Sequence, residues 1–114
     1  MLDINIETIG DVVIMHFKGT LTRDVLKDLE DAWEDEALRS PGMIALDFKN
    51  ITQIDSICIN HLFKMVRMSK DKNFDLVIYD VFESLKKIFE VIKLDRIVTI
   101  MSRQQFESSY LKNP

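Results

Sequence analysis

Few residues of this chain could do chemistry, and the closest pair is Cys58 and His61. Three positions apart on one predicted helix, they could form a thiolate–imidazole pair for nucleophilic catalysis. However, no third group is placed to orient the imidazole, and free cysteines usually pack in protein cores. We therefore expect Cys58 to be a buried structural residue, and a hydrolase is the least favoured function.

Metal and phosphate sites have equally little support. The two histidines, His16 and His61, belong to no H-x-x-x-H or C-x-x-C pair, so a zinc site would need carboxylates to complete it. Three glycines in 114 residues leave no material for a glycine-rich phosphate loop. The sequence therefore predicts no cofactor, no metal and no enzyme activity.

The pair Asp55-Ser56 stands where an apolar strand and its loop give way to a helix. A serine there can cap the helix, with its hydroxyl beside the free first-turn amides and the positive end of the helix dipole. The simplest interpretation is a structural cap. Because the same amides can solvate an anion, the fold would also tolerate a phosphate on Ser56.

The helix that begins at Ser56 has two faces at 100° per residue. The face expected to pack on the sheet contains Cys58, Ile59, Leu62, Val66 and Ser69. The face expected to be exposed contains Ile57, Asn60, His61, Lys64, Arg67 and Met68. Apolar residues exposed beside basic ones favour a surface for a partner protein, although Met65 and Met68 are better explained as packing residues.

Composition narrows the class of protein. A net charge of −4 and a pI near 5.1 disfavour nucleic acid as a direct partner. With 46% hydrophobic and 30% charged residues, residues 1–114 suffice for a single domain with one core. A single cysteine, no signal-peptide pattern and no run of ~20 apolar residues predict a cytoplasmic protein without membrane insertion.

The predicted elements follow the order ββαβαβαβα. Strands are expected at residues 2–6, 12–18 (ended by Gly19), 43–48, 74–79 and 96–100, with a loop at 50–55. Helices are expected at 22–37, 56–70, around 85–92 and from 102, capped by Thr22, by Ser56, by Asp80 or Ser84, and by the Ser102/Gln105 capping box. Such alternation predicts an α/β domain with four helices and a mixed, mostly parallel sheet of four or five strands.

The first predicted helix also carries Asp24, Asp28, Asp31 and Asp35 along one side. Such a stripe is usually a solvated face, although it could bind a basic partner.

Several of these segments resemble the STAS family, the domain of bacterial anti-sigma-factor antagonists and of sulfate-transporter tails. The resemblance begins with Ala45-Leu46-Asp47-Phe48, followed by Ile54-Asp55-Ser56 and a helix. Gly19-Thr20-Leu21 stands where the family has G-x-L, and the segment 85–94 where it has V-x-x-x-F/L-x-x-x-G-L. The chain departs from the family pattern at Ile57 and Cys58 (for Ser-Gly of D-S-S-G), at Lys93 (for glycine) and at Phe82-Glu83 (for Ser-Pro).

The resemblance implies an antagonist that binds an anti-sigma factor with serine kinase activity, is phosphorylated on Ser56 and is reset by a phosphatase. Asp55 and Ile57 would then belong to the switch loop. We expect the partner to contact Thr22, Asn60, His61, Lys64 and Met68. The alternative is a phosphorylation-independent STAS module, such as an accessory subunit of a lipid ABC transporter or a stress-complex scaffold; a homodimer also stays open.

Overall fold

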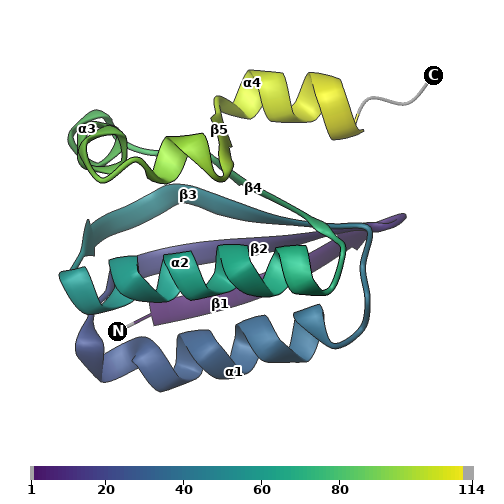
Figure 1. The fold of residues 1–114 in the computed structure, drawn as a ribbon, viewed down its shortest axis with the longest axis horizontal. Coiled ribbons are helices and arrows are strands. Elements are labelled where there is room, and N and C mark those ends of the chain that lie inside the picture. Colours follow the sequence, from purple (N-terminus) through teal and green to yellow (C-terminus); the bar gives the residue numbers. More distant parts are fainter. Residues whose placement is uncertain (1, 112–114) are drawn as a thin grey trace.

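A five-stranded mixed sheet with the order β1-β2-β3-β4-β5 forms the centre of the molecule (Figure 1). The computed structural model describes residues 2–111. The strands are β1 (Leu2–Ile9), β2 (Val12–Leu21), β3 (Met43–Ile54), β4 (Asp75–Tyr79) and β5 (Thr99–Met101). β1 and β2 pair antiparallel through a tight turn in which Gly10 has a φ of +59°, and the remaining pairs are parallel. The predicted α/β fold with a mixed, mostly parallel sheet is confirmed.

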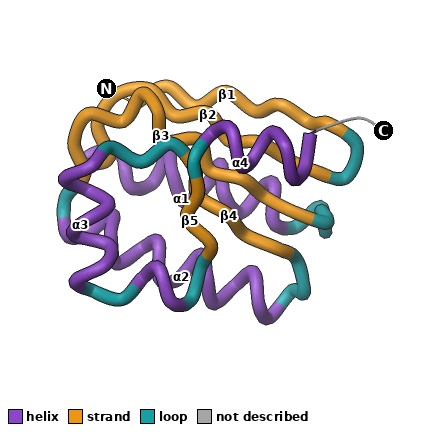
Figure 2. Tube along the Cα trace, turned by 90° about the horizontal axis from the view of Figure 1, so that it is seen from above, coloured by secondary structure: helices purple, strands orange, loops and turns teal. Residues whose placement is uncertain are grey.

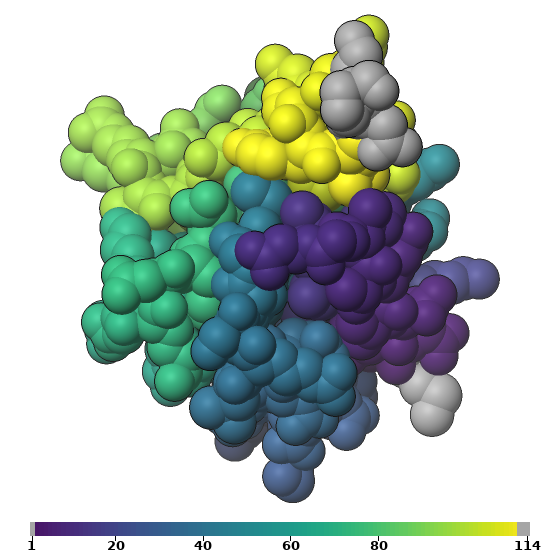
Figure 3. All heavy atoms as spheres, turned by 90° about the vertical axis from the view of Figure 1, so that its right-hand side faces the viewer, coloured from purple at the N-terminus to yellow at the C-terminus, as the bar shows by residue number. Residues whose placement is uncertain are grey.

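Four α-helices cover the two faces of this sheet. They are α1 (Leu26–Ala37), α2 (Ser56–Asp71), α3 (Glu83–Val91) and α4 (Arg103–Phe106), which continues into a π-helical segment, Glu107–Leu111. The view from above shows β1 along one side of the molecule and α2 along the opposite side (Figure 2). The space-filling view shows the C-terminal residues above the N-terminal strands (Figure 3).

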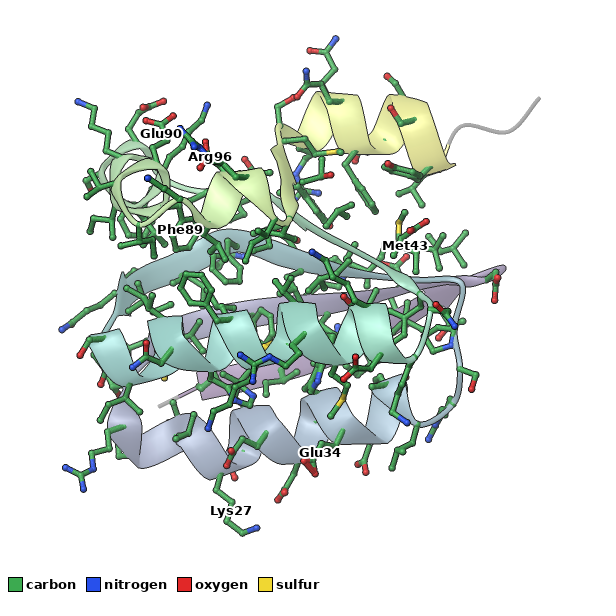
Figure 4. The ribbon with its side chains drawn as sticks, viewed as in Figure 1. Lys27, Glu34, Met43, Phe89, Glu90 and Arg96 are labelled. Carbon is green, nitrogen blue, oxygen red and sulfur yellow. The ribbon has the colours of Figure 1, made fainter. Side chains whose placement is uncertain are left out.

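The main core fills the space between the sheet and the helices α1, α2 and α3. The ring of Phe48 on β3 contacts Phe17 at a centroid distance of 5.9 Å and Phe89 of α3 at 6.4 Å. Phe89 points from its helix toward the sheet (Figure 4). A smaller cluster lies on the other face, where Phe106 of α4 stacks on Tyr79 at 4.3 Å.

The two clusters explain why β3 begins with six apolar or buried residues in a row. Ile44, Leu46 and Phe48 face the main core, whereas Met43 and Ala45 face the α4 side. A strand buried on both faces has no polar face to alternate with.

Strands β2 and β3 are longer than the sequence predicts. β2 continues through Gly19 to Leu21, and β3 continues through the predicted loop to Ile54. These extensions pair with each other in parallel, from Lys18 with Asn50 to Leu21 with Ile54. The predictions that Gly19 ends a strand and that 50–55 is a loop are wrong, because pairing with a neighbouring strand outweighs the local turn propensity of these residues.

The segment between β4 and β5 also differs in detail. Leu94–Arg96 is a 3₁₀ turn, so the last strand is Thr99–Met101 and not 96–100. Neither Asp80 nor Ser84 caps α3, whose N-cap residue is Phe82 with no side-chain cap. Lys93, which stands where the STAS pattern has glycine, has a left-handed backbone with a φ of +64° just after this helix, a conformation that favours glycine.

The capping box at the start of α4 is confirmed. The Gln105 amide donates to the Ser102 Oγ at 3.1 Å, and the Ser102 amide donates to the Gln105 Oε1 at 3.0 Å.

Candidate functional site

Ser56 is the first residue of α2 and is exposed at the carboxyl end of β3. The cap of this helix is not Ser56 but Asp55, which has an extended backbone and whose Oδ1 accepts from the Cys58 amide at 3.0 Å. The prediction that Ser56 caps the helix is therefore wrong by one position. Within residues 2–111 no hydrogen bond uses the Ser56 hydroxyl, so it is free to react or to contact a partner.

Asp55 also connects two segments that are distant in sequence. Its Oδ2 accepts from the Arg23 amide at 2.8 Å, and its own amide donates to the Leu21 carbonyl at 3.0 Å. The hydrogen bond from the Cys58 amide is the main cause that lowers the pKa of this carboxyl, and the Arg23 amide adds to it. Asp55 thereby holds the β2–α1 connection against the start of α2.

Thr22 does not cap the following helix, contrary to expectation. It precedes a 3₁₀ turn, Arg23–Val25, and makes no capping hydrogen bond. Its hydroxyl donates instead to the carboxylate of Asp24, and this bond lowers the pKa of Asp24. The end of the molecule around Ser56 thus presents two ionised carboxylates, those of Asp24 and Asp55.

The outer side of α2 agrees with the predicted faces at most positions. Asn60, Lys64 and Arg67 are exposed and Ile57 is 36% exposed, whereas the predicted inner residues Cys58, Leu62, Val66 and Ser69 are buried and Ile59 is half-buried. A hollow of about 400 Å³ opens between α1 and α2; its lining is Leu26, Glu30, Ile57, Asn60, His61, Phe63, Lys64 and Arg67.

His61 and Met68 do not lie exposed on this surface. His61 is only 8% exposed, with its Nδ1 3.9 Å from the Glu30 Oε2 and its Nε2 without a partner within residues 2–111. Burial lowers the pKa of the imidazole. Met68 is half-buried, and its sulfur accepts from the Trp33 Nε1 at 3.2 Å. Both side chains lie on the side of α2 that packs against α1, and a helical wheel of α2 alone does not show this contact.

Cys58 is fully buried, as expected. Burial raises the pKa of its thiol to about 12, so the group is protonated at neutral pH. A buried thiol of this kind is a packing residue and not a nucleophile.

A network of charged side chains on the opposite face of the sheet was not predicted. His16 on β2 donates through Nδ1 to Asp47 at 2.7 Å and through Nε2 to Glu7 at 2.8 Å. Asp47 also accepts from the Arg103 Nη2 at 3.0 Å, and the Arg103 Nε donates to Asp80 at 2.9 Å. The one signal in the sequence was an aspartate within the apolar run of β3, which requires a partner if it is buried.

The network sets the protonation of its members. Burial disfavours the charged form of His16, but the bonds to Glu7 and Asp47 outweigh it and raise its pKa. Burial likewise opposes ionisation of Asp47, but the Lys49 amide, His16 and Arg103 together lower its pKa. Since Arg103 belongs to α4 and its guanidinium also lies 5.2 Å from the centre of the Tyr79 ring, the network fastens α4 to the sheet.

Two further findings concern the described residues as a whole. Residues 2–111 contain no group of three or more His, Cys, Asp or Glu side chains arranged to hold a metal ion. None of their helices is both long and apolar enough to span a lipid bilayer.

Solved structures with a similar fold include several anti-sigma factor antagonists. The antagonist from Mycobacterium paratuberculosis shares 14% identity over 98% of this chain and 96% of its own, with a TM-score of 0.82. The putative anti-sigma factor antagonist TM1081 from Thermotoga maritima shares 17% identity over 96% of this chain and 95% of its own, with a TM-score of 0.86. The phosphorylated form of SpoIIAA from Bacillus shares 11% identity over 93% and 97%, with a TM-score of 0.72.

A search among curated proteins finds no match to the sequence. The model of the STAS domain family matches residues 3–106, which is almost the entire chain. The chain therefore belongs to the STAS domain family.

Proposed function

We propose that the chain is an anti-sigma-factor antagonist, which binds an anti-sigma factor with serine kinase activity and is switched by phosphorylation of Ser56. The observation that carries the proposal is the exposed Ser56 hydroxyl at the start of α2, free of the capping role that Asp55 performs. The similar folds of anti-sigma factor antagonists, among them SpoIIAA in unphosphorylated and phosphorylated forms, support it. Such a partner would place the protein in the cytoplasm.

A phosphate on Ser56 would change the site's charge without unfolding it. It adds about −1.5 to −2 charges. The free amides at the start of α2 can solvate the new anion, so the fold tolerates it. Asp55 and Asp24 already make this end negative, so a phosphate there adds like charge to an exposed acidic surface.

The expected consequence is loss of the partner. If placing the added charge against the partner costs the interface about 1.4 to 2.7 kcal/mol, affinity falls about ten- to a hundred-fold. The contact surface we propose consists of Thr22, Ile57, Asn60 and Lys64, with the half-buried Met68 and the hollow that His61 lines at its border. A phosphatase that removes the phosphate would restore binding.

Phosphorylation is tested by incubating the protein with the candidate kinase and ATP and locating the phosphate by mass spectrometry. The label should be present in wild type, absent in Ser56→Ala and retained in Ser84→Ala. Ser84 is a matched control because it is also an exposed serine in the first turn of a helix, α3. Phosphate that is still incorporated into Ser56→Ala would contradict the proposed switch at Ser56.

The second candidate is a phosphorylation-independent STAS module, such as an accessory subunit of a lipid ABC transporter or a stress-complex scaffold. Ile57 favours it, because this apolar side chain is 36% exposed directly beside Ser56, where the family has a second serine. A partner that binds through Ile57 would be lost in Ile57→Asp and unaffected by Ser56→Glu. The proposed antagonist should be weakened by both substitutions.

A further inference from the structure

The helices α1 and α2 lie side by side on one face of the sheet and carry opposite charges (Figure 1). Residues 26–37 of α1 include one basic and six acidic residues, and of the acidic residues only Glu36 is buried. Residues 56–71 of α2 include three basic residues and one acidic residue, and Lys72 follows. The outer surface of this layer is therefore an acidic stripe beside a basic stripe.

These charges are largely unpaired within the molecule. The salt bridges of residues 2–111 include none from Lys64, Arg67 or Lys72. Lys27 of α1 points away from α2, and it pairs with Asp31 of its own helix at 3.3 Å (Figure 4). Two hollows of about 400 and 430 Å³ lie along α2, and Lys64 and Arg67 line both of them.

The position of the two stripes restricts what can cover them. A purely acidic partner placed on Lys64 and Arg67 would meet the carboxylates of α1 directly beside them. A complementary partner must present basic side chains opposite α1 and acidic side chains opposite α2. A second copy of this chain does so when it is rotated by 180° about an axis that runs along the groove between the two helices.

We infer that this face is a self-complementary interface, in which α1 of one copy lies over α2 of the other and the reverse. Both helices connect parallel strands and so run in the same direction, which makes the four helices of the pair parallel. A two-fold axis perpendicular to the helices would place α1 over α1 and α2 over α2, so that charges of the same sign would face each other. Only the axis along the groove brings opposite charges together.

The interface is expected to be weak and dependent on salt. Its apolar part is small: Ile57 is 36% exposed, and Leu26, Phe63 and Met68 in the hollows are half-buried. Exposed ion pairs contribute little each and are screened by salt. The dimer would cover Lys64 and Met68, so it would compete with the partner surface proposed above, but its existence does not depend on that function.

The test is sedimentation velocity over a concentration series at low ionic strength and at about 0.5 M NaCl, where the Debye length is about 4 Å. We expect a dimer at low salt that dissociates at high salt. Lys64→Glu/Arg67→Glu should abolish it, as should Asp31→Lys/Asp35→Lys. The variant that carries all four substitutions should dimerise again, because each reversed charge on α2 then faces a reversed charge on α1 of the other copy.

The matched control is Lys86→Glu/Lys87→Glu on the exposed side of α3, which changes the net charge by the same amount as the α2 variant and should leave the dimer intact. Circular dichroism establishes that each variant is folded, and Lys64→Gln/Arg67→Gln replaces the α2 variant if that one is not. A protein that stays monomeric at low salt, or a fourfold variant that fails to dimerise, overturns the inference. Neither result affects the proposal for Ser56, which is measured by phosphorylation.

Discussion

Replacing Asp47 by asparagine tests whether the charged network holds the C-terminal helix on the sheet. Asp47 is 5% exposed and accepts three hydrogen bonds: from the His16 Nδ1 at 2.7 Å, the Arg103 Nη2 at 3.0 Å and the Lys49 amide at 3.0 Å. An asparagine fills the same space but has one acceptor oxygen and no charge. It leaves His16 and Arg103 without their common counter-charge.

The magnitude follows from this geometry. Removing one partner of a buried ion pair typically costs about 3–5 kcal/mol. Arg103 is partly exposed and keeps Asp80 at 2.9 Å, and His16 keeps Glu7 at 2.8 Å, so part of the loss is recovered. We expect the free energy of unfolding to fall by roughly 2–3 kcal/mol, somewhat below that range, because these contacts remain.

Urea unfolding followed by circular dichroism measures this difference, with Asp75→Asn on the exposed start of β4 as the matched control. Hydrogen exchange should show the largest increase in the amides of α4, because Arg103 is the charged link between this helix and the sheet. A loss of less than about 0.5 kcal/mol, which is the range of ordinary surface substitutions, would refute the reasoning.

Three further predictions concern single residues. Because the folded pKa of His16 is raised above 6.5, the stability that its charged form contributes is complete below about pH 6.5 and is lost as the pH rises through the folded pKa. In urea titrations at several pH values, His16→Gln should remove this loss of stability. A pH profile identical to that of the wild type would contradict the prediction. The folded pKa of His61 is lowered, so stability is lost as the pH falls from 6.5 through the folded pKa, and His61→Leu should remove this acid-side loss in the same titrations. His61→Leu should not destabilise the protein at neutral pH, because it removes a buried nitrogen that has no hydrogen-bond partner within residues 2–111. Lys93→Gly should raise the free energy of unfolding by roughly 0.5–1 kcal/mol, because glycine adopts the left-handed conformation without the steric cost that lysine has there; a decrease would show that the lysine side chain contributes more than the strain.

Local patterns predicted the elements and their order because hydrophobic spacing decides them. The spacing of Leu29 and Trp33 on α1 and of Cys58, Leu62 and Val66 on α2 places these side chains in the main core. The S-x-x-Q capping box at Ser102 depends on four consecutive residues and was predicted correctly. The resemblance to the STAS family added the expectation that Ser56, at the start of the second helix, is the phosphorylated residue.

Features that depend on distant residues were not predictable in the same way. β3 extends to Ile54 because β2 lies beside it, and no local pattern in this polar stretch indicates that. His61 is buried because α1 packs against it, although its position on α2 alone indicates exposure. The network from Glu7 to Arg103 joins residues up to 96 positions apart, and only Asp47, an aspartate within an apolar strand, stands out in its own segment.

We propose that a partner is gained or lost at the exposed hydroxyl of Ser56. The most direct test is to measure the affinity of the proposed anti-sigma factor for the protein carrying phosphoserine at position 56, incorporated during translation, against the unmodified protein. We predict that the phosphorylated form is still folded and binds about ten- to a hundred-fold more weakly. Equal affinity of the two folded forms would contradict the account.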